Sequence, residues 1–213
     1  MAVHIYNLVK PLEARATLLE RKLYIFTSRE FSLLFELDTY QTEYMLAALV
    51  KEGLLERLKR GLYTLKTDPP SEQEIANALY KPSYISCDYA LAYYSLIPEM
   101  VYQVTSATTK PTRLFTTDTL AYGYYTIKKE AYTGYTITKK QDRAFLIAEP
   151  EKAVVDYLYA LTLGQRGLLG KRSVNDRLDI HKLNAEKMLR FTKLCASPKL
   201  DEWINKLLLK EHI

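Results

Sequence analysis

The chain has 213 residues, of which 48% are hydrophobic and 26% are charged, as in ordinary folded globular proteins. No apolar run reaches the ~20 residues that a bilayer-spanning helix needs, and the first residues do not resemble a secretory signal, so we expect a cytoplasmic protein without membrane contact. The net charge of +5 favours an acidic partner such as nucleic acid. Most of the excess lies between residues 161 and 213, with 11 Lys and Arg against 6 Asp and Glu, a pattern that a solvated helical face would also give.

The first 68 residues predict three helices followed by a β-hairpin. The first helix is expected over residues 12–23, where leucines recur at helical spacing. Capping boxes, in which Thr or Asp precedes Glu or Gln by three residues, predict the starts of the next two helices at residues 28 and 39. These boxes are Thr27 with Glu30 and Asp38 with Gln41. Gly53 is expected to end the third helix.

The third helix has two distinct faces when plotted at 100° per residue. Its core stripe consists of Thr42, Met45, Leu46, Leu49 and Val50. The opposite face carries two tyrosines, two alanines and a lysine, and could lie close against a DNA groove. Its candidate base-contacting residues are Tyr40, Gln41, Glu43 and Tyr44, and Lys51 follows further along the helix.

The hairpin follows directly, with strands expected at 54–58 and 62–66 and with Lys59 and Arg60 at its tip. Two adjacent cations at such a tip could contact phosphates or enter the minor groove. Ser28 and Arg29, which begin the second helix, could hold another phosphate. The sequence therefore predicts a winged helix-turn-helix that binds double-stranded DNA, although such modules also serve in dimerisation or protein docking. Glu43 counts against DNA unless it pairs with a cytosine amino group or a cation.

The stretch "KTDPPSEQE" at 66–74 predicts a domain boundary, because two prolines precede a new helix start at Ser71. We expect a DNA-binding domain over residues 1–68 and a second domain over 71–213. In the second domain the pattern predicts a helix near 87–95, a meander of five strands over 101–148, a helix from 149, and two or three further helices. The expected fold class is α+β, with the winged helix followed by a larger mixed α+β domain that has a mainly antiparallel sheet and C-terminal helices.

Tyrosine is concentrated in the second domain: 11 of the 18 tyrosines lie between Tyr80 and Tyr135. Most are expected to pack in the core, although a stacking surface for bases or a partner is the alternative. Lys110 and Arg113 flank a proline between two expected strands and could bind phosphate or an acidic partner, or lie in an exposed loop.

No catalytic or cofactor site is predicted. "GQRGLLGKRS" at 164–173 departs from the phosphate-loop spacing and lacks its Ser or Thr, and the carboxylates of "EPEK" at 149–152 suit a helix start. The three histidines, His4, His181 and His212, are scattered, and Cys87 and Cys195 have no metal-binding spacing. We therefore expect a non-enzymatic protein without metal or cofactor.

Four stretches in order, "GLLERLKRGLYTL", "PSYISCDYALAYYSLIPE", "VTSATTKPTRLF" and "AEPEKAVVDYLY", make the chain resemble the AbiEi antitoxins of abortive-infection toxin–antitoxin systems, over about residues 10–165. The resemblance implies a winged helix followed by an antitoxin domain. It also implies repression of the chain's own operon at inverted repeats, and type IV antagonism of a nucleotidyltransferase-like toxin without stable association. On this basis Tyr40, Gln41 and Tyr44 match the recognition helix, Lys59 and Arg60 match the wing, and Lys110 and Arg113 lie in the antitoxin domain.

One alternative remains open from the sequence. The chain could be a stand-alone winged-helix regulator whose second domain serves assembly or ligand sensing. A nucleotidyltransferase-like gene beside its own would favour the antitoxin, and the lack of one would favour the regulator.

Overall fold

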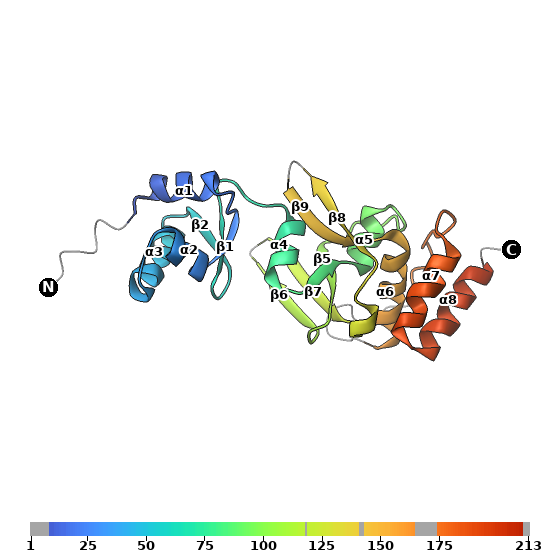
Figure 1. Ribbon diagram of the computed structural model, residues 1–213. Coiled ribbons are helices and arrows are strands. Elements are labelled where there is room, and N and C mark those ends of the chain that lie inside the picture. Colours follow the sequence, from blue (N-terminus) through green and yellow to red (C-terminus); the bar gives the residue numbers. More distant parts are fainter. Residues whose placement is uncertain (1–8, 118, 141–142, 165–173, 211–213) are drawn as a thin grey trace. The chain divides into compact units, whose positions relative to one another are not determined.

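The structure is a computed structural model that describes residues 9–117, 119–140, 143–164 and 174–210. The chain divides into two compact units, Met1–Ser71 and Glu72–Ile213. Most of their elements are labelled in Figure 1, and each unit is considered by itself.

The first unit contains three helices and a three-stranded antiparallel sheet. In chain order its elements are α1 (Pro11–Glu20), β1 (Ile25–Thr27), α2 (Ser28–Leu34), α3 (Thr39–Lys51), β2 (Leu55–Lys59) and β3 (Leu62–Leu65). The sheet order is β1-β3-β2, so that β3 lies between the other two strands. This arrangement of helices and hairpin is that of a winged helix, as predicted.

Both predicted capping boxes are present. The Thr27 hydroxyl accepts the amide hydrogen of Glu30, and the Asp38 carboxylate accepts that of Gln41, while the Glu and Gln side chains bond back to the cap residues. Gly53 follows α3 with a positive φ of 78°, which glycine adopts without strain.

Two expectations for the first unit were wrong. Strand β1 was not predicted, because its three residues are too short to show an alternating pattern. The first helix also ends earlier than the expected residue 23, at Glu20, since Lys22 adopts a left-handed backbone conformation that helices exclude.

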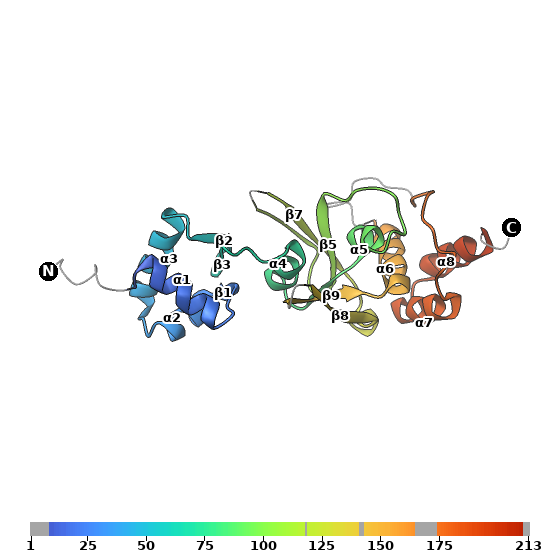
Figure 2. The same ribbon diagram turned by 90° about the horizontal axis from the view of Figure 1, so that it is seen from above.

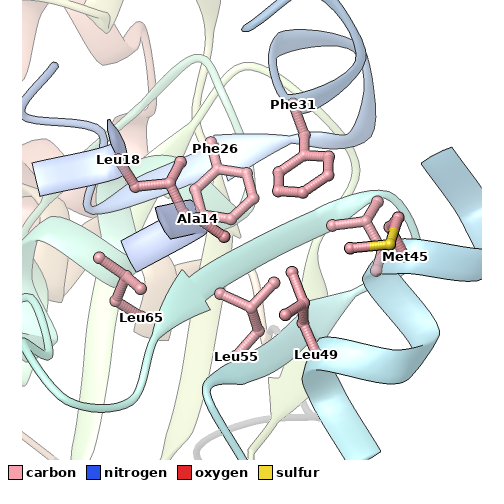
Figure 3. Packing of buried hydrophobic residues seen from close by; sticks show 9 residues of the cluster. Ala14, Leu18, Phe26, Phe31, Met45, Leu49, Leu55 and Leu65 are labelled. Carbon is pink, nitrogen blue, oxygen red and sulfur yellow. The ribbon is translucent and has the colours of Figure 1, made fainter. Parts of the chain in front are cut away.

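The core of the first unit joins all three helices to the sheet. Figure 3 shows Phe26 of β1 and Phe31 of α2 facing each other, with ring centroids 5.8 Å apart, above Leu49 and Leu55. All four side chains are buried. Burial of an aromatic or leucine side chain contributes about 1.5–3 kcal/mol. The hydrophobic stripe of α3 is thus fixed against the sheet, which leaves its other face exposed.

The second unit is a six-stranded mixed sheet with helices. Its elements are α4 (Glu72–Leu79), β4 (Ser83–Ile85), α5 (Cys87–Tyr93), β5 (Gln103–Thr108), β6 (Arg113–Thr116), β7 (Ala121–Thr126), the 3₁₀ turn η1 (Lys129–Ala131), β8 (Tyr135–Lys140), β9 (Arg143–Ala148), α6 (Pro150–Thr162), α7 (Ala185–Cys195) and α8 (Pro198–Lys210). Helices α7 and α8 lie side by side beyond α6, as both views show (Figures 1 and 2).

The predicted meander was wrong. The strand order is β6-β7-β5-β4-β9-β8, in which β5–β7 and β4–β9 are parallel and the other three pairs are antiparallel. The sequence predicts which residues form strands but not which strands are neighbours in the sheet. Burial gives the physical reason: the residues of β5 and β7 are mostly buried, so these strands take central places, whereas β6 is mostly exposed and lies at an edge.

Four tyrosines, Tyr84, Tyr122, Tyr124 and Tyr125, are almost completely buried, which confirms core packing for these members of the tyrosine-rich segment. Among the described residues, no helix combines the length and the apolar character needed to cross a membrane.

Candidate nucleic-acid interface

The outer face of α3 is open to solvent. Tyr40 and Tyr44 are 67% and 42% exposed, and Glu43 and Lys51 are exposed as well. The opposite stripe is buried at Thr42, Met45, Leu46 and Leu49, with Val50 half-buried, as the helical plot predicted. The two tyrosines therefore present their hydroxyl groups outward at the N-terminal half of the helix. Phenolic hydroxyls in this position can donate or accept a hydrogen bond at a base edge or a phosphate.

Gln41 is less available than its neighbours because it belongs to the cap of α3. Its Oε1 accepts the backbone N–H of Asp38 at 3.1 Å, and its own N–H donates to Asp38 Oδ1 at 2.8 Å. The side chain is half-buried, and only its amide nitrogen remains to donate to a ligand. Use of both amide atoms at an adenine edge would require Oε1 to accept two hydrogen bonds, one from the base and one from the Asp38 N–H.

The tip of the wing lies against the start of α2. The backbone N–H of Ser28 donates to the carbonyl of Gly61 at 3.2 Å, and Ser28 Oγ is within van der Waals reach of a side chain built on Gly61. Gly61 has a φ of 75°, the left-handed conformation that closes the turn after Lys59 and Arg60. The fold thus brings together Ser28 and the wing tip, which are more than 30 residues apart in sequence.

Three cationic residues are close in sequence to the two residues of this contact. Arg29 and Arg60 are exposed, and among the described residues neither forms an ion pair. Lys59 is half-buried beside Arg60. A guanidinium group without an ion-pair partner is well suited to phosphate oxygens, which it can bind through two parallel N–H donors. The four residues Ser28, Arg29, Lys59 and Arg60 are called the basic junction below.

The backbone amides of α2 contribute less than the sequence suggested. The cap uses the Glu30 amide, and the Glu30 carboxylate accepts the N–H of Thr27 at 2.6 Å and its hydroxyl at 2.9 Å. A carboxylate at this helix start repels a phosphate there. An anion at the junction would therefore be held by the side chains of Arg29, Arg60 and Ser28 rather than by the helix terminus.

Lys110 and Arg113 of the second unit lie on aromatic rings. The Lys110 ammonium is 5.3 Å from the Tyr80 ring centroid, and the Arg113 guanidinium is 5.9 Å from the same centroid and 4.9 Å from that of Phe115. The Tyr80 hydroxyl donates to the carbonyl of Pro111, which fixes the loop between the two cations. Both cations are exposed, and no carboxylate pairs with them in the described part of the chain. Cation–π contacts leave the N–H donors free, so this group can bind an anion.

Sequence reasoning missed the aromatic supports Tyr80 and Phe115. Phe115 could have been found, because in β6 it lies two residues from Arg113 and so on the same face. Tyr80 could not, since it follows α4 and meets β6 only through the tertiary fold.

The candidate catalytic groups rejected from sequence have structural partners where the structure describes them. Glu149 and Glu151 both pair with Lys187, at 2.7 and 3.0 Å. Burial disfavours the charged form of Glu151, yet hydrogen bonds from Lys187 and backbone N–H groups outweigh it and lower the pKa of this carboxyl below its usual value. Burial raises the pKa of the Cys87 thiol well above its usual value and that of Cys195 to about 11, so neither is a ready nucleophile.

His181 is exposed, whereas residues 165–173, His4 and His212 lie outside the described residues. Within the described ranges, no three His, Cys, Asp or Glu side chains gather so as to hold a metal ion.

The chain matches a known family over part of its length. Residues 16–66 match the family described as "Transcriptional regulator, AbiEi antitoxin". The matched segment runs from within α1 to the end of β3, and so includes α3 and the basic junction. It covers about a quarter of the chain, and over these residues it confirms the resemblance noted from the sequence. The family is described as a regulator rather than as an enzyme. A comparison with curated proteins returned no match.

Proposed function

We propose that the chain is an antitoxin that represses its own operon, with the first unit binding the operator DNA and the second counteracting a nucleotidyltransferase-like toxin. One observation supports the DNA-binding part: the contact between Gly61 and Ser28 joins the wing tip to the start of α2, and these two segments carry the four residues of the basic junction within the part that matches the regulator family. The exposed face of α3 lies in the same unit and would contact base edges in the major groove.

The proposed division of labour follows from the chemistry of the two surfaces. The arginines of the junction and Lys51 would neutralise phosphates and supply most of the affinity, which does not depend on sequence. Tyr40 and Tyr44 would supply sequence preference, with Gln41 contributing one donor. Glu43 would then lie opposite a cytosine amino group or a cation, because beside a phosphate its charge would weaken binding.

Binding to an inverted repeat requires two copies of the first unit. Each copy would occupy one half-site, and the half-sites would be separated by about one helical turn of DNA or a multiple of it. A footprint on the upstream region of the operon measures this spacing directly.

A mobility-shift assay on the upstream region tests the DNA-binding proposal. We expect Lys59→Ala/Arg60→Ala to weaken binding at ~150 mM salt by at least about tenfold, because the variant loses two phosphate contacts. A matched control is Arg21→Ala/Lys66→Ala, which removes the same two residue types from exposed positions outside α2, α3 and the tip. If the tip variant shifts DNA as well as the wild type does, the wing has no role in binding.

For the second unit, we propose that Lys110 and Arg113 form part of the surface required for antitoxin activity. Their donors are fixed by Tyr80 and Phe115, and they lack carboxylate partners among the described residues, which suits an acidic or phosphorylated target.

Co-expression of the full chain with the neighbouring toxin gene separates the two activities. Lys110→Gln/Arg113→Gln should lose rescue from the toxin and retain operator binding, whereas Lys59→Ala/Arg60→Ala should do the opposite. If the first variant rescues fully, these cations are not part of the antitoxin surface. If no nucleotidyltransferase-like gene adjoins this one, the alternative of a stand-alone regulator is favoured.

A further inference from the structure

The six-stranded sheet of the second unit is split between two of its central strands. Strands β4 and β9 are paired at a single position, Ile85 with Ile147. Before that position the Asn77 side chain of α4 replaces the missing strand partner. Its amide nitrogen donates to the carbonyl of Leu146 at 3.3 Å, and its amide oxygen accepts the Leu146 N–H at 2.5 Å. Asn77 therefore pairs with the backbone N–H and carbonyl of Leu146 on β9, at the point where β4 and β9 diverge.

A pocket of about 530 Å³ is lined by both sides of this split. Residues 81–83 border it at the start of β4, residues 144–146 border it on β9, and Tyr132, Tyr135 and Ile137 complete its wall. This volume is within the range of ligand pockets, about 300–1,000 Å³.

The wall of the pocket is aromatic. The rings of Tyr132 and Tyr135 are 5.4 Å apart, and Tyr135 stacks on the buried Tyr84 at 4.7 Å with an interplanar angle of 18°. Tyr132 and Tyr135 are only half-buried, and both residues line the pocket. Such rings favour a planar aromatic ligand, which can stack against them or meet them edge to face.

Two polar groups of the pocket are unused. Ser83 is 3% exposed, and its hydroxyl has no hydrogen-bond partner among the described residues. The oxygen atom is enclosed, so a ligand would reach it after the Ser83 side chain turns toward the pocket. Because a buried hydroxyl without a partner costs about 1–3 kcal/mol, a ligand that bonds to it would be favoured. Lys81 is exposed at the rim, is the one charged residue among those that line the pocket, and makes no ion pair within the described ranges.

From this geometry we propose that the pocket binds a small planar aromatic molecule that carries an anionic group. The aromatic ring lies against Tyr132 and Tyr135, a polar ring atom bonds to Ser83 Oγ, and the anionic group pairs with Lys81 Nζ. Nucleoside monophosphates and aromatic carboxylates share this chemistry. The site lies within the second unit, so it is independent of the DNA-binding proposal.

Calorimetric titration of the full chain with two probe classes tests the site. The probes are the four nucleoside 5′-monophosphates, and 4-hydroxybenzoate with indole-3-acetate. We expect at least one class to bind with a Kd below about 1 mM, and the class that binds identifies the source of the ligand. Lys81→Gln should weaken that binding about tenfold, because it removes a charge-assisted hydrogen bond. The uncharged analogue of the same probe should bind both proteins equally.

Two further variants test the pocket, one by filling its open side and the other by removing the buried hydroxyl. Ala144 is exposed and lines the pocket, so Ala144→Trp should fill it without disturbing the core, and Ser83→Ala removes the hydroxyl at nearly constant shape. Both should reduce binding, and Lys129→Gln, which changes an exposed lysine outside the pocket, should not. The proposal is overturned if no probe binds at about 5 mM, or if Lys81→Gln and Ser83→Ala bind as the wild type does.

Discussion

A buried ion pair on α6 gives the sharpest prediction about stability. Lys152 and Asp156 are both fully buried and pair one turn apart on the helix. The Asp156 carboxylate also accepts the hydroxyls of Tyr84 at 2.9 Å and Ser86 at 2.7 Å. These contacts join α6 to β4 and to the residue that caps α5. The perturbation is Lys152→Met, which keeps an unbranched side chain one atom shorter and removes its charge.

The magnitude follows from what remains after the substitution. Asp156 keeps two hydroxyl donors but loses the cation that pairs with it, and a buried charge left without its partner costs about 3–5 kcal/mol. This is a large share of the ~5–15 kcal/mol by which folded domains are stable. The double variant Lys152→Met/Asp156→Asn has no charge and still offers an oxygen to the two hydroxyls. We therefore expect it to be more stable than Lys152→Met alone.

Urea unfolding followed by Trp203 fluorescence measures these effects, because the single tryptophan lies on α8 of the same unit. The matched control is Lys206→Met, which breaks the Glu202–Lys206 pair, also four residues apart but largely exposed. Its unfolding midpoint should equal that of the wild type. A loss of less than about 1 kcal/mol for Lys152→Met, or a double variant less stable than the single one, would refute the reasoning.

Three further results are expected. Asp38→Ala removes the side-chain cap of α3 and should lower the stability of the first unit by about 1 kcal/mol, measured by thermal unfolding. Asp38→Ser is the conservative control. No loss of stability in Asp38→Ala would contradict a stabilising role for the cap. Because the folded-state pKa of Glu151 is lowered, this carboxylate contributes to the free energy of unfolding above its unfolded pKa, and the contribution is lost as pH falls below about 4.5. Lys187→Gln should therefore make the stability fall less steeply on the acid side of a plot of unfolding free energy against pH. An unchanged acid side would contradict this. Gly134→Ala should lower the free energy of unfolding by about 2 kcal/mol or more, because φ at Gly134 is 74° and the new Cβ would lie 2.6 Å from the Phe191 ring. A midpoint of urea unfolding equal to that of the wild type would show that the loop adjusts.

The first unit was largely predictable because its signals are local. A capping box lies within four residues, and the stripe on α3 repeats within a few turns, so both were readable in the sequence and both are present. The contact between Ser28 and Gly61 was not readable, because it depends on β1, whose three residues carry no periodic pattern and which brings the start of α2 to the wing.

The second unit was less predictable, because its arrangement depends on contacts between residues that are far apart in the sequence. Its strands were visible as runs of β-branched and aromatic residues, but their neighbours depend on contacts between distant segments. The split between β4 and β9 is a property of this pairing, and it decides where the pocket bordered by Lys81 and Ser83 lies. The charged residues of α6 were correctly placed at a helix start, but their burial and pairing with Lys187 depend on α7, far along the chain.

The proposed role of the first unit is tested most directly by the salt dependence of operator binding. Fluorescence anisotropy of a labelled operator would compare the wild type with Arg29→Gln/Arg60→Gln and with the control Arg21→Gln/Lys66→Gln. Each phosphate contact contributes about 0.9 to the slope of log K against log salt concentration, so the loss of two contacts should make the slope shallower by about 1.8. The control should keep the wild-type slope and affinity. Equal slopes for all three proteins would contradict the assignment of the basic junction to DNA.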